Sequence, residues 1–350
     1  MANTRQLREI FDVCFDEPRR WTNWFFSSIA RDDDVVTVEA DGKTVSGALM
    51  QRYSSAYAGA TLTSAYISCV GTLPQARGHG HATALLAGCL RRARSAGTAL
   101  AELIPAEPHL FDYYRRSAGF ATVFYVESLH YTAIHRFDEC GEVVEPTFEL
   151  LHDLELRHGC GVLHSADDFK YILTDLSLDK GSFMTAACNG AGSAIAVAVD
   201  TDGNAATPVC VRALLADNTE AAETVLADVR KRVGKRSLTV WAPPSRSAAA
   251  TGLRPRAMLR IVDADAVLGA LAAANPSLCF SIVLHDPILP ENSGVYRLRD
   301  GVCTRDDERP RRPDLEADIT TLTAILFSAP ATGDIFGLPT RRPYISLMLD

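Results

Sequence analysis

Hydrophobic and polar positions in the first third of the chain follow two different periods, which mark helices and strands. Apolar side chains recur at helical spacing from Leu7 to Phe15 and from Trp21 to Ile29, which predicts two amphipathic helices. Strand-like stretches follow at 35–39, 44–52 and 64–72. The chain therefore opens with two helices that lead into three strands.

A further helix is predicted over 81–96, because apolar side chains share one face and arginines gather near its C-terminal end before Gly97. A strand at 98–104, a short helix that follows Pro105 and Pro108 and runs through Arg116, and a strand at 120–131 complete the series. This order of helices and strands implies an α/β layer fold, with a mixed sheet flanked by helices.

The middle of the chain repeats part of this order. Strands are predicted at 193–199 and 209–215, followed by a helix at 219–233 and a strand at 238–241. The run Pro243–Ser247 is the expected linker to the last segment.

The last segment begins near Arg256, where Met258–Val262 leads into a helix pattern. The pattern predicts that helix at 264–274, strands at 279–285 and 296–299, and a charged loop at 305–313. The residues 344–349 are almost wholly apolar, which is unusual for a chain end. We expect this tail to be buried, because apolar surface is costly to leave in water.

Composition narrows the class of protein. A chain of 350 residues with 47% hydrophobic residues is longer than one typical domain, and it has no apolar run as long as a membrane span. A soluble, cytoplasmic protein is expected, with no membrane contact. The net charge of −8 argues against a nucleic-acid partner and favours cationic acceptors such as amines.

The nine cysteines include no CxxC pair, which favours reduced and mostly buried thiols. The densest group of potential metal ligands is His152, His158, Cys160 and His164, and it lacks the spacing of a zinc site. No metal is therefore expected.

The loop Gln75–Gly80 lies between a predicted strand and a predicted helix. Successive backbone N–H groups and the positive end of the helix would meet there, which is the arrangement of an anion site. Gly78 and Gly80 lack side chains where a pyrophosphate would approach, and Arg77 could add a charged contact. The alternative is a tight turn that needs glycine for its conformation alone.

A dinucleotide-binding fingerprint is a second alternative, since Gly78, Gly80 and Ala82 fit G-x-G-x-A and Glu102 could contact a ribose. Its glycines should follow the strand almost directly, whereas Pro74 and several further residues intervene here. This context argues against it.

The run Val70–Ala82 resembles the acyl-CoA motif of GNAT acetyltransferases, whose core is Q/R-x-x-G-x-G/A after a V-x-T-x-P strand end. The resemblance implies that acetyl-CoA is a co-substrate. It also implies that the strand end pairs with the pantetheine arm and that the amides from Gln75 to His81 hold the pyrophosphate. The residues so implicated are Cys69, Val70, Gly71, Thr72, Gln75, Ala76, Arg77, Gly78, His79, Gly80 and His81.

The stretch 110–120 resembles the GNAT element Y-x-x-x-G-F, whose tyrosine protonates the departing thiolate. The spacing to Gly119 favours Tyr114, and Tyr113 stays open because the interval is one residue longer than in the family. The alternative is an aromatic pair that only packs a helix onto the sheet.

The resemblance extends to the whole chain. A GNAT domain at 1–132, a degenerate GNAT-like domain at 133–252 and a sterol-carrier-like α+β domain at 253–350 together resemble the Eis-type acetyltransferases. That resemblance also suggests assembly into a homo-oligomer.

The resemblance implies an N-acetyltransferase in which a primary amine attacks the thioester directly, with the Val70 amide stabilising the oxyanion. The strand before the loop contains no carboxylate to act as general base. In Eis-type enzymes the terminal carboxylate serves, which here belongs to Asp350, and Glu102 and water are the alternatives. A non-catalytic acyl-CoA-binding or regulatory protein is the other functional class, and the acceptor, a small molecule or a peptide amine, stays open.

Overall fold

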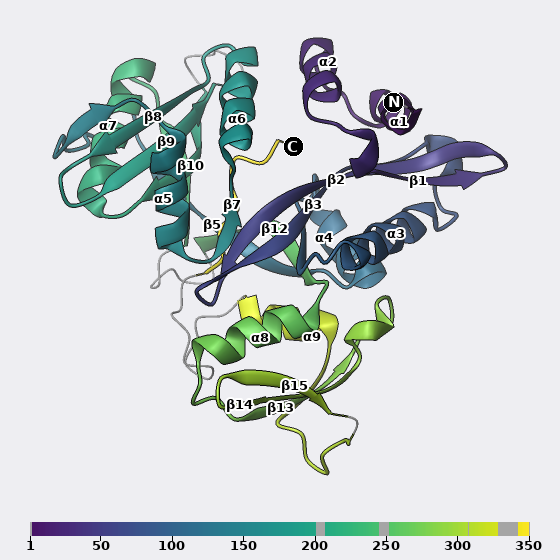
Figure 1. Ribbon diagram of the computed structural model, residues 1–350. Coiled ribbons are helices and arrows are strands. Elements are labelled where there is room, and N and C mark those ends of the chain that lie inside the picture. Colours follow the sequence, from purple (N-terminus) through teal and green to yellow (C-terminus); the bar gives the residue numbers. More distant parts are fainter. Residues whose placement is uncertain (1, 201–206, 245–251, 307, 328–341, 350) are drawn as a thin grey trace. The chain divides into compact units, whose positions relative to one another are not determined.

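The computed structural model describes residues 2–200, 207–244, 252–306, 308–327 and 342–349 (Figure 1). It has the predicted mixed α/β architecture, with strands flanked by helices. The chain divides into two compact units. Unit 1 contains the described residues of 1–123 and 257–340, and unit 2 contains those of 124–256 and 341–349.

Unit 1 opens with the predicted order of helices and strands. Its elements are α1 (Ala2–Cys14), α2 (Arg19–Ser28), β1 (Val35–Ala40), β2 (Lys43–Tyr57), β3 (Ala60–Thr72), α3 (His81–Ser95), β4 (Leu100–Leu103), α4 (Pro108–Ala118) and the start of β5 (Ala121–Tyr131). Strands β1, β2 and β3 pair antiparallel, and β4 pairs parallel to β3. The helix α3 is therefore the crossover between two parallel strands.

The strand β12 (Leu253–Ile261) runs antiparallel to β4, with Arg260 opposite Ala101. Sequence reasoning treated Met258–Val262 only as the lead into a helix. The pattern was missed because two arginines and Pro255 interrupt the alternation that marks a strand.

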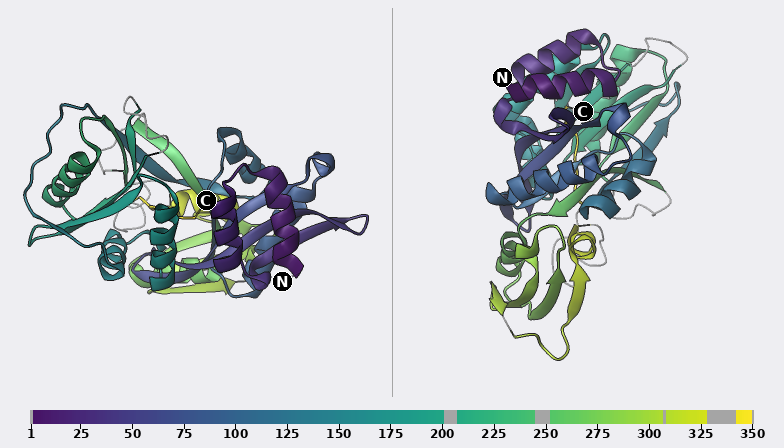
Figure 2. Two further views of the ribbon diagram at one scale, coloured as in Figure 1. Left: turned by 90° about the horizontal axis from the view of Figure 1, so that it is seen from above. Right: turned by 90° about the vertical axis from the view of Figure 1, so that its right-hand side faces the viewer.

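Helices cover both faces of these strands. α1 lies on one face, where a Cβ added at Gly47 would be 3.0 Å from Leu7 Cδ1 and one added at Gly71 would be 2.9 Å from Ile10 Cγ2. α3 packs on the opposite face through Leu86 and its neighbours (Figures 1 and 2). The two glycines let α1 approach the strands closely.

The rest of unit 1 is a small α+β region around a four-stranded sheet with the order β15-β14-β13-β16. Its elements are α8 (Ala264–Ala274), β13 (Phe280–His285), β14 (Gly294–Arg299), β15 (Val302–Asp306), β16 (Leu315–Asp318) and α9 (Ile319–Phe327). The helix at 264–274 is confirmed, but the loop predicted from Arg305 is wrong at its start, because Arg305 pairs within β15. β16 and α9 were not predicted.

Unit 2 begins within β5, and its strands follow the order β5-β11-β10-β9-β8-β6. Its further elements are β6 (Glu142–Val144), α5 (Phe148–His158), β7 (Gly161–Leu163), α6 (Ala166–Leu178), β8 (Phe183–Cys188), β9 (Ser193–Val199), β10 (Val209–Ala216), α7 (Thr219–Val233) and β11 (Leu238–Ala242). The parallel order β10-α7-β11 repeats β3-α3-β4. Most of the expected linker, 245–247, lies outside the described residues.

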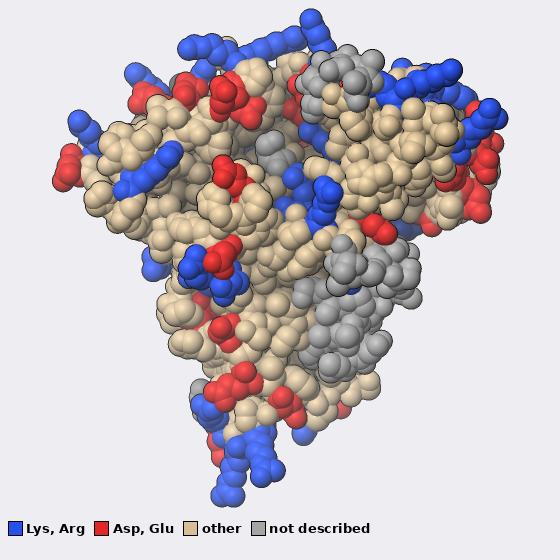
Figure 3. Space-filling model, turned by 180° about the vertical axis from the view of Figure 1, so that it is seen from behind, with Lys and Arg blue, Asp and Glu red and all other residues tan. Residues whose placement is uncertain are grey.

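Lys and Arg side chains are interspersed with Asp and Glu on the face that Figure 3 shows, with no broad basic surface there. This distribution agrees with the net charge of −8. None of the described helices is long and apolar enough to cross a membrane.

Candidate active site

The predicted anion loop joins β3 to α3. After the short turn Pro74–Ala76, both Gly78 and Gly80 adopt the left-handed conformation with φ +81°. A Cβ added at either glycine would have no protein atom within 4 Å. The glycines are therefore required for backbone conformation, and the space beside them is open to a ligand.

The start of α3 has no side chain that caps it. Gly80 is its N-cap residue, and no side-chain hydrogen bond is made there. The first N–H groups of an α-helix have no partner within the helix, and the helix dipole makes that end positive. His81 and the two residues after it thus present amide donors at the point where the loop is open, which suits a phosphate group.

The loop borders an open groove of about 810 Å³, a volume typical of ligand clefts. Gln75, Ala76, His79 and His81 line it on the loop side. The opposite walls come from α1 and from the β1–β2 hairpin, which contribute three carboxylates and Lys43.

Two side chains of the loop are turned onto the backbone. Arg77 Nε donates to the Thr72 carbonyl oxygen at 3.1 Å, and His79 Nδ1 lies 2.9 Å from the Arg77 carbonyl oxygen. Both interactions fix the loop at the end of β3. The role of Arg77 toward a pyrophosphate stays a prediction.

A β-bulge interrupts β3 just before the loop. Opposite β2, Ser68 pairs with Leu49 and Gly71 with Gly47, so that Cys69 and Val70 together face one residue. Cys69 has φ +53°, which is rare for a residue with a side chain. The bulge therefore takes the Val70 amide out of regular register with β2.

On its other edge, β3 separates from β4 before its end. The parallel register runs from Ser64 opposite Leu100 to Tyr66 opposite Glu102, and β4 ends at Leu103. The last residues of β3, from Ile67 to Thr72, extend beyond this pairing. A strand edge that lacks its neighbour can pair with an extended ligand arm.

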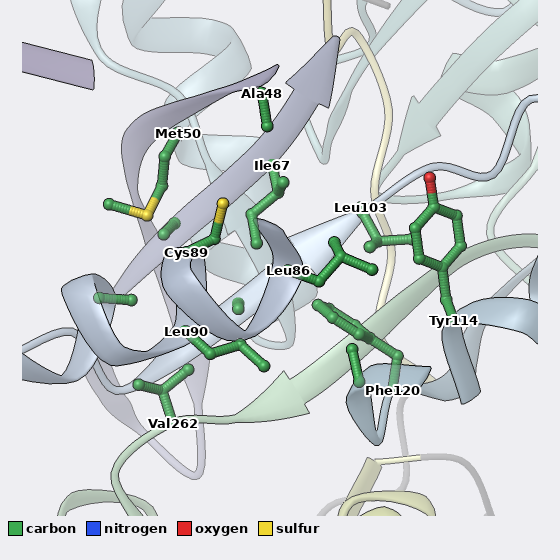
Figure 4. Packing of buried hydrophobic residues seen from close by; sticks show 14 of the residues in the cluster. Ala48, Met50, Ile67, Leu86, Cys89, Leu90, Leu103, Tyr114, Phe120 and Val262 are labelled. Carbon is green, nitrogen blue, oxygen red and sulfur yellow. The ribbon is translucent and has the colours of Figure 1, made fainter. Parts of the chain in front are cut away.

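Tyr114 lies on α4 and packs in the cluster between the helices and the sheet. Its side chain lies beside Leu103, and its hydroxyl points away from Phe120 and the other labelled side chains (Figure 4). Burial raises the pKa of this hydroxyl above its usual value. Tyr114 therefore keeps its proton through neutral and mildly alkaline pH.

Tyr113, the alternative acid, contacts a different element. Its hydroxyl lies 3.4 Å from the Thr83 hydroxyl in the first turn of α3, and its ring packs edge-on against Tyr114. The Tyr113 hydroxyl thus lies near the start of α3, whereas the Tyr114 side chain is buried in the cluster between the helices and the sheet.

The surroundings of Cys69 disfavour the thiolate form of its side chain. Burial, with a smaller contribution from the negative charge of Glu17, raises the pKa of its thiol to about 12. Glu17 lies in the connection between α1 and α2, and sequence reasoning missed it because nothing in its local pattern links it to β3.

Glu102 is fully buried in β4, and its Oε1 accepts a hydrogen bond from the Ser55 hydroxyl at 2.6 Å. Its neighbours Ala101 and Leu103 face the cluster around α3, so the alternation of a strand places Glu102 on the other face. This burial gives Glu102 a structural role in the sheet. Its role as general base stays an untested alternative.

Unit 2 lacks an equivalent anion loop at its repeated strand-helix-strand order. The Asn218 side chain caps α7 by accepting a hydrogen bond from the Ala221 N–H at 2.8 Å. Asp217 and Glu220 add negative charge beside this helix start. A phosphate at the start of α7 would find the Ala221 N–H already hydrogen-bonded and would be repelled by the two carboxylates.

The apolar tail is buried, as the sequence predicts: each residue of Tyr344–Leu349 is at most 6% exposed. Within unit 2 its backbone pairs beside β7, where the Tyr344 N–H donates to Cys160 O at 3.1 Å and Tyr344 O accepts from Val162 N–H at 3.3 Å. A Cβ added at Gly161 would lie 2.0 Å from Tyr344 O, so only glycine fits there. Asp350 lies outside the described residues.

A buried ion pair lies next to the tail. His164 Nδ1 is 2.6 Å from Glu155 Oε1, and the His164 N–H donates to Glu155 Oε2 at 2.9 Å. Burial alone would lower the pKa of His164, but the charge and hydrogen bond of Glu155 outweigh it and raise that pKa, with help from Asp168 and the Leu347 backbone. Among the described residues, no group of three or more His, Cys, Asp or Glu side chains is placed to hold a metal ion.

Comparison with known proteins identifies two of the regions. Residues 2–122 match the family model of an acetyltransferase (GNAT) domain, and residues 265–333 match that of a sterol carrier protein domain. The chain thus has a match to a GNAT domain near its start and a match to a sterol carrier protein domain in its last segment. A search of curated proteins finds no match to the chain.

Several solved structures share the fold over almost the whole chain. Eis1 from Mycobacterium abscessus is 15% identical with a TM-score of 0.69, and the match covers 97% of this chain and 91% of Eis1. A GCN5-related N-acetyltransferase from Anabaena variabilis is 17% identical with a TM-score of 0.73, covering 96% and 91%. A probable N-acyltransferase from Enterococcus faecalis is 16% identical with a TM-score of 0.74, covering 96% and 90%. At these identities the likeness shows a shared fold.

Proposed function

We propose that this chain, which joins a GNAT domain to a sterol carrier protein domain, transfers the acyl group of acetyl-CoA to a primary amine. The observation that supports the proposal is the order of three structural features along β3 and α3. An uncapped helix start follows an open glycine loop, and the loop follows a bulged strand end that extends beyond its neighbour β4. Such a series suits a long ligand with a pyrophosphate at one end and a thioester at the other.

The chemistry proceeds by direct attack. A neutral amine attacks the thioester carbonyl carbon, and the carbonyl oxygen becomes an oxyanion, which the Val70 N–H stabilises by donating to it. The C–S bond then breaks, and Tyr114 gives its hydroxyl proton to the thiolate. A protonated Cys69 thiol supports this route over an acyl-enzyme at that residue.

The ammonium formed by attack must lose a proton to a base. We propose that the terminal carboxylate of Asp350 has this role, as the resemblance to Eis-type enzymes implies. Extending the chain by two residues after Asp350 moves that carboxylate while leaving the tail sequence intact. The extended protein is expected to bind acetyl-CoA with unchanged affinity and to transfer the acetyl group at least 10-fold more slowly.

We propose a cationic acceptor, either a small amine or a peptide amine, and a protein that acts inside the cell. The net charge of −8 and the three carboxylates that line the groove, Glu9, Glu39 and Asp41, support this choice. Homo-oligomeric assembly is a further proposal, which light scattering of the purified protein tests directly.

The decisive experiment measures CoA release from acetyl-CoA with a panel of amines, and mass spectrometry of the products locates the new amide. Turnover with at least one amine supports the proposal. Tight acetyl-CoA binding without turnover of any amine would instead identify a non-catalytic acyl-CoA-binding protein.

A further inference from the structure

The motif Met258–Val262, which the proposed reaction does not use, contains the bulkiest fully buried side chain among the described residues. Arg260 lies in β12 with none of its surface exposed, and its partner Asp286 is likewise inaccessible. Removing two charges from water is costly, so a buried ion pair contributes little net stability over an apolar pair of the same shape. We therefore looked for a role of this pair other than stability.

Every arm of the Arg260 guanidinium has a partner. Nη2 donates to Asp286 Oδ1 at 2.7 Å, and Nη1 donates to the Ile261 carbonyl oxygen at 2.8 Å. Nε donates to the carbonyl oxygen of Ala118, the last residue of α4, at 2.6 Å. Arg260 thus joins β12 to the helix that carries Tyr114.

Asp286 is held in turn by the sterol-carrier-like region. Its Oδ1 also accepts from the N–H groups of Ile288 and Leu289 at 3.1 and 3.0 Å, and its Oδ2 accepts from Asn292 Nδ2 at 3.0 Å. Asn292 Nδ2 also lies 3.1 Å from the Val262 carbonyl oxygen. These contacts hold the Asp286 carboxylate in place, and the carboxylate in turn orients the Arg260 guanidinium toward α4.

The hydrogen bond from Arg260 to the Ala118 carbonyl oxygen lies close enough to Tyr114 to affect the position of its side chain. Ala118 is one helical turn after Tyr114, and both side chains are buried in the same cluster. The last carbonyl groups of a helix lack partners within it, and a cation at that end is favourable for the helix dipole. A Cβ added at Gly119 would be 3.4 Å from Arg260 Nε and 3.3 Å from Ile319 Cγ2 of α9, which shows how closely the helix end is enclosed.

We propose that Arg260 is a positioning residue for acyl transfer: with Asp286 it locks the C-terminal end of α4 and so fixes where the Tyr114 hydroxyl points. This inference rests on the proposed function, because it assigns a task to Tyr114. It makes the sterol-carrier-like region a structural part of the catalytic apparatus, through Asp286 and α9.

The test variant is Arg260→Lys, which keeps a cation facing Asp286 but removes the planar fork that reaches Ala118. We expect kcat to fall at least 10-fold, with the KM for acetyl-CoA within about twofold of wild type, because the glycine loop is not disturbed. A loosened α4 also exposes Tyr114 to water, so its pKa falls toward the ordinary value of about 10, and the alkaline limb of the kcat profile moves to lower pH.

The matched control is Arg236→Lys in unit 2. Arg236 is also a well-bonded arginine, with Asp200 and the Thr207 carbonyl oxygen as partners. This variant is expected to keep the wild-type kcat and pH profile. If Arg260→Lys does not fold, the double variant Arg260→Met/Asp286→Leu removes both buried charges together and is measured in its place.

Hydrogen exchange supplies a readout that does not depend on activity. Amides in 114–120 are expected to exchange faster in Arg260→Lys, while those at the start of α3 stay as in wild type. A folded Arg260→Lys protein with wild-type kcat and alkaline limb would overturn the inference. If the wild-type protein acetylates no amine, the proposed function fails, and unchanged exchange over 114–120 would then overturn the inference separately.

Discussion

The hydroxyl groups of Tyr113 and Thr83 lie 3.4 Å apart, whereas the Tyr114 hydroxyl points away from the other side chains that Figure 4 labels. The two tyrosines are neighbours on α4, and the sequence alone left the general acid open between them. We propose Tyr114 as the acid, because the resemblance favours it and burial keeps its hydroxyl protonated.

We expect Tyr114→Phe to lower kcat by roughly 10²–10⁴ and to leave acetyl-CoA affinity little changed, because only the proton donor is lost. Tyr113→Phe is the matched control and should retain most of the wild-type kcat. Steady-state kinetics and calorimetry of both variants decide the matter. The assignment moves to Tyr113 if that variant is the inactive one.

The pH dependence of kcat should reflect the burial of Tyr114. Burial raises the pKa of this hydroxyl, so the acid form persists above the ordinary tyrosine value of about 10. On the alkaline side, kcat should therefore stay level up to at least about pH 10 and fall only beyond it. An alkaline limb centred well below pH 10 would show that another group supplies the proton.

Gly80→Asp places a carboxylate in the open space at the start of α3. We expect acetyl-CoA affinity to fall by several kcal/mol, through repulsion of the pyrophosphate and through occupation of the first helix amides. Gly80→Asn is the control, because asparagine tolerates the left-handed conformation and caps the helix without a charge. Calorimetry should show weakened binding for Asn and much weaker binding for Asp. Equal affinities in all three proteins would remove the loop from the site.

Gly161→Ala tests the seating of the tail. The added methyl group would overlap the Tyr344 carbonyl oxygen, so the tail must move away from β7. We expect faster proteolysis near Tyr344 and reduced acyl transfer, with acetyl-CoA affinity unchanged. Gly190→Ala is the control for a substitution at positive φ without a clash, because Gly190 has φ +78° and open space around it.

The His164–Glu155 pair should make stability depend on pH. Because the pKa of His164 is higher in the folded protein than its unfolded value of about 6.5, the pair stabilises fully below that pH. This stabilisation is lost as the pH rises through the folded pKa. Denaturant unfolding measured at pH 6 and pH 9 gives the free energy of unfolding at each pH. From pH 6 to pH 9 this free energy should decrease more for wild type than for His164→Gln. The exposed His109→Gln should behave like wild type.

Local signals in the sequence were enough to locate many of the elements. The helix α7 was predicted with its observed bounds, since Asn218 caps it and Gly234 follows it. The helices α5 and α6 were missed, although Thr147 and the Ser165–Asp168 capping box mark their starts. Charged and polar residues at 148–158 obscured the short apolar stripe of α5.

The candidate site was predictable where it depends on local chain conformation. Glycines that require a left-handed backbone marked the loop. The bulge at Cys69 was not predictable, because a cysteine with φ +53° has no sequence signature. The contact of Arg260 with Asp286 and Ala118 joins segments far apart in sequence, and a single chain without homologues offers no means to pair them.

The asparagine that caps α7 leads us to expect a single acetyl-CoA site per chain. Units 1 and 2 both contain parallel strands joined by a helix, so the fold alone would allow two nucleotide-type ligands per chain. The Asn218 side chain accepts a hydrogen bond from an N–H group at the start of α7, whereas no side chain caps the start of α3 after Gly80. A saturating titration should therefore end at one equivalent of acetyl-CoA. The apolar cluster of the second unit instead includes Tyr344 and Leu347 of the terminal segment.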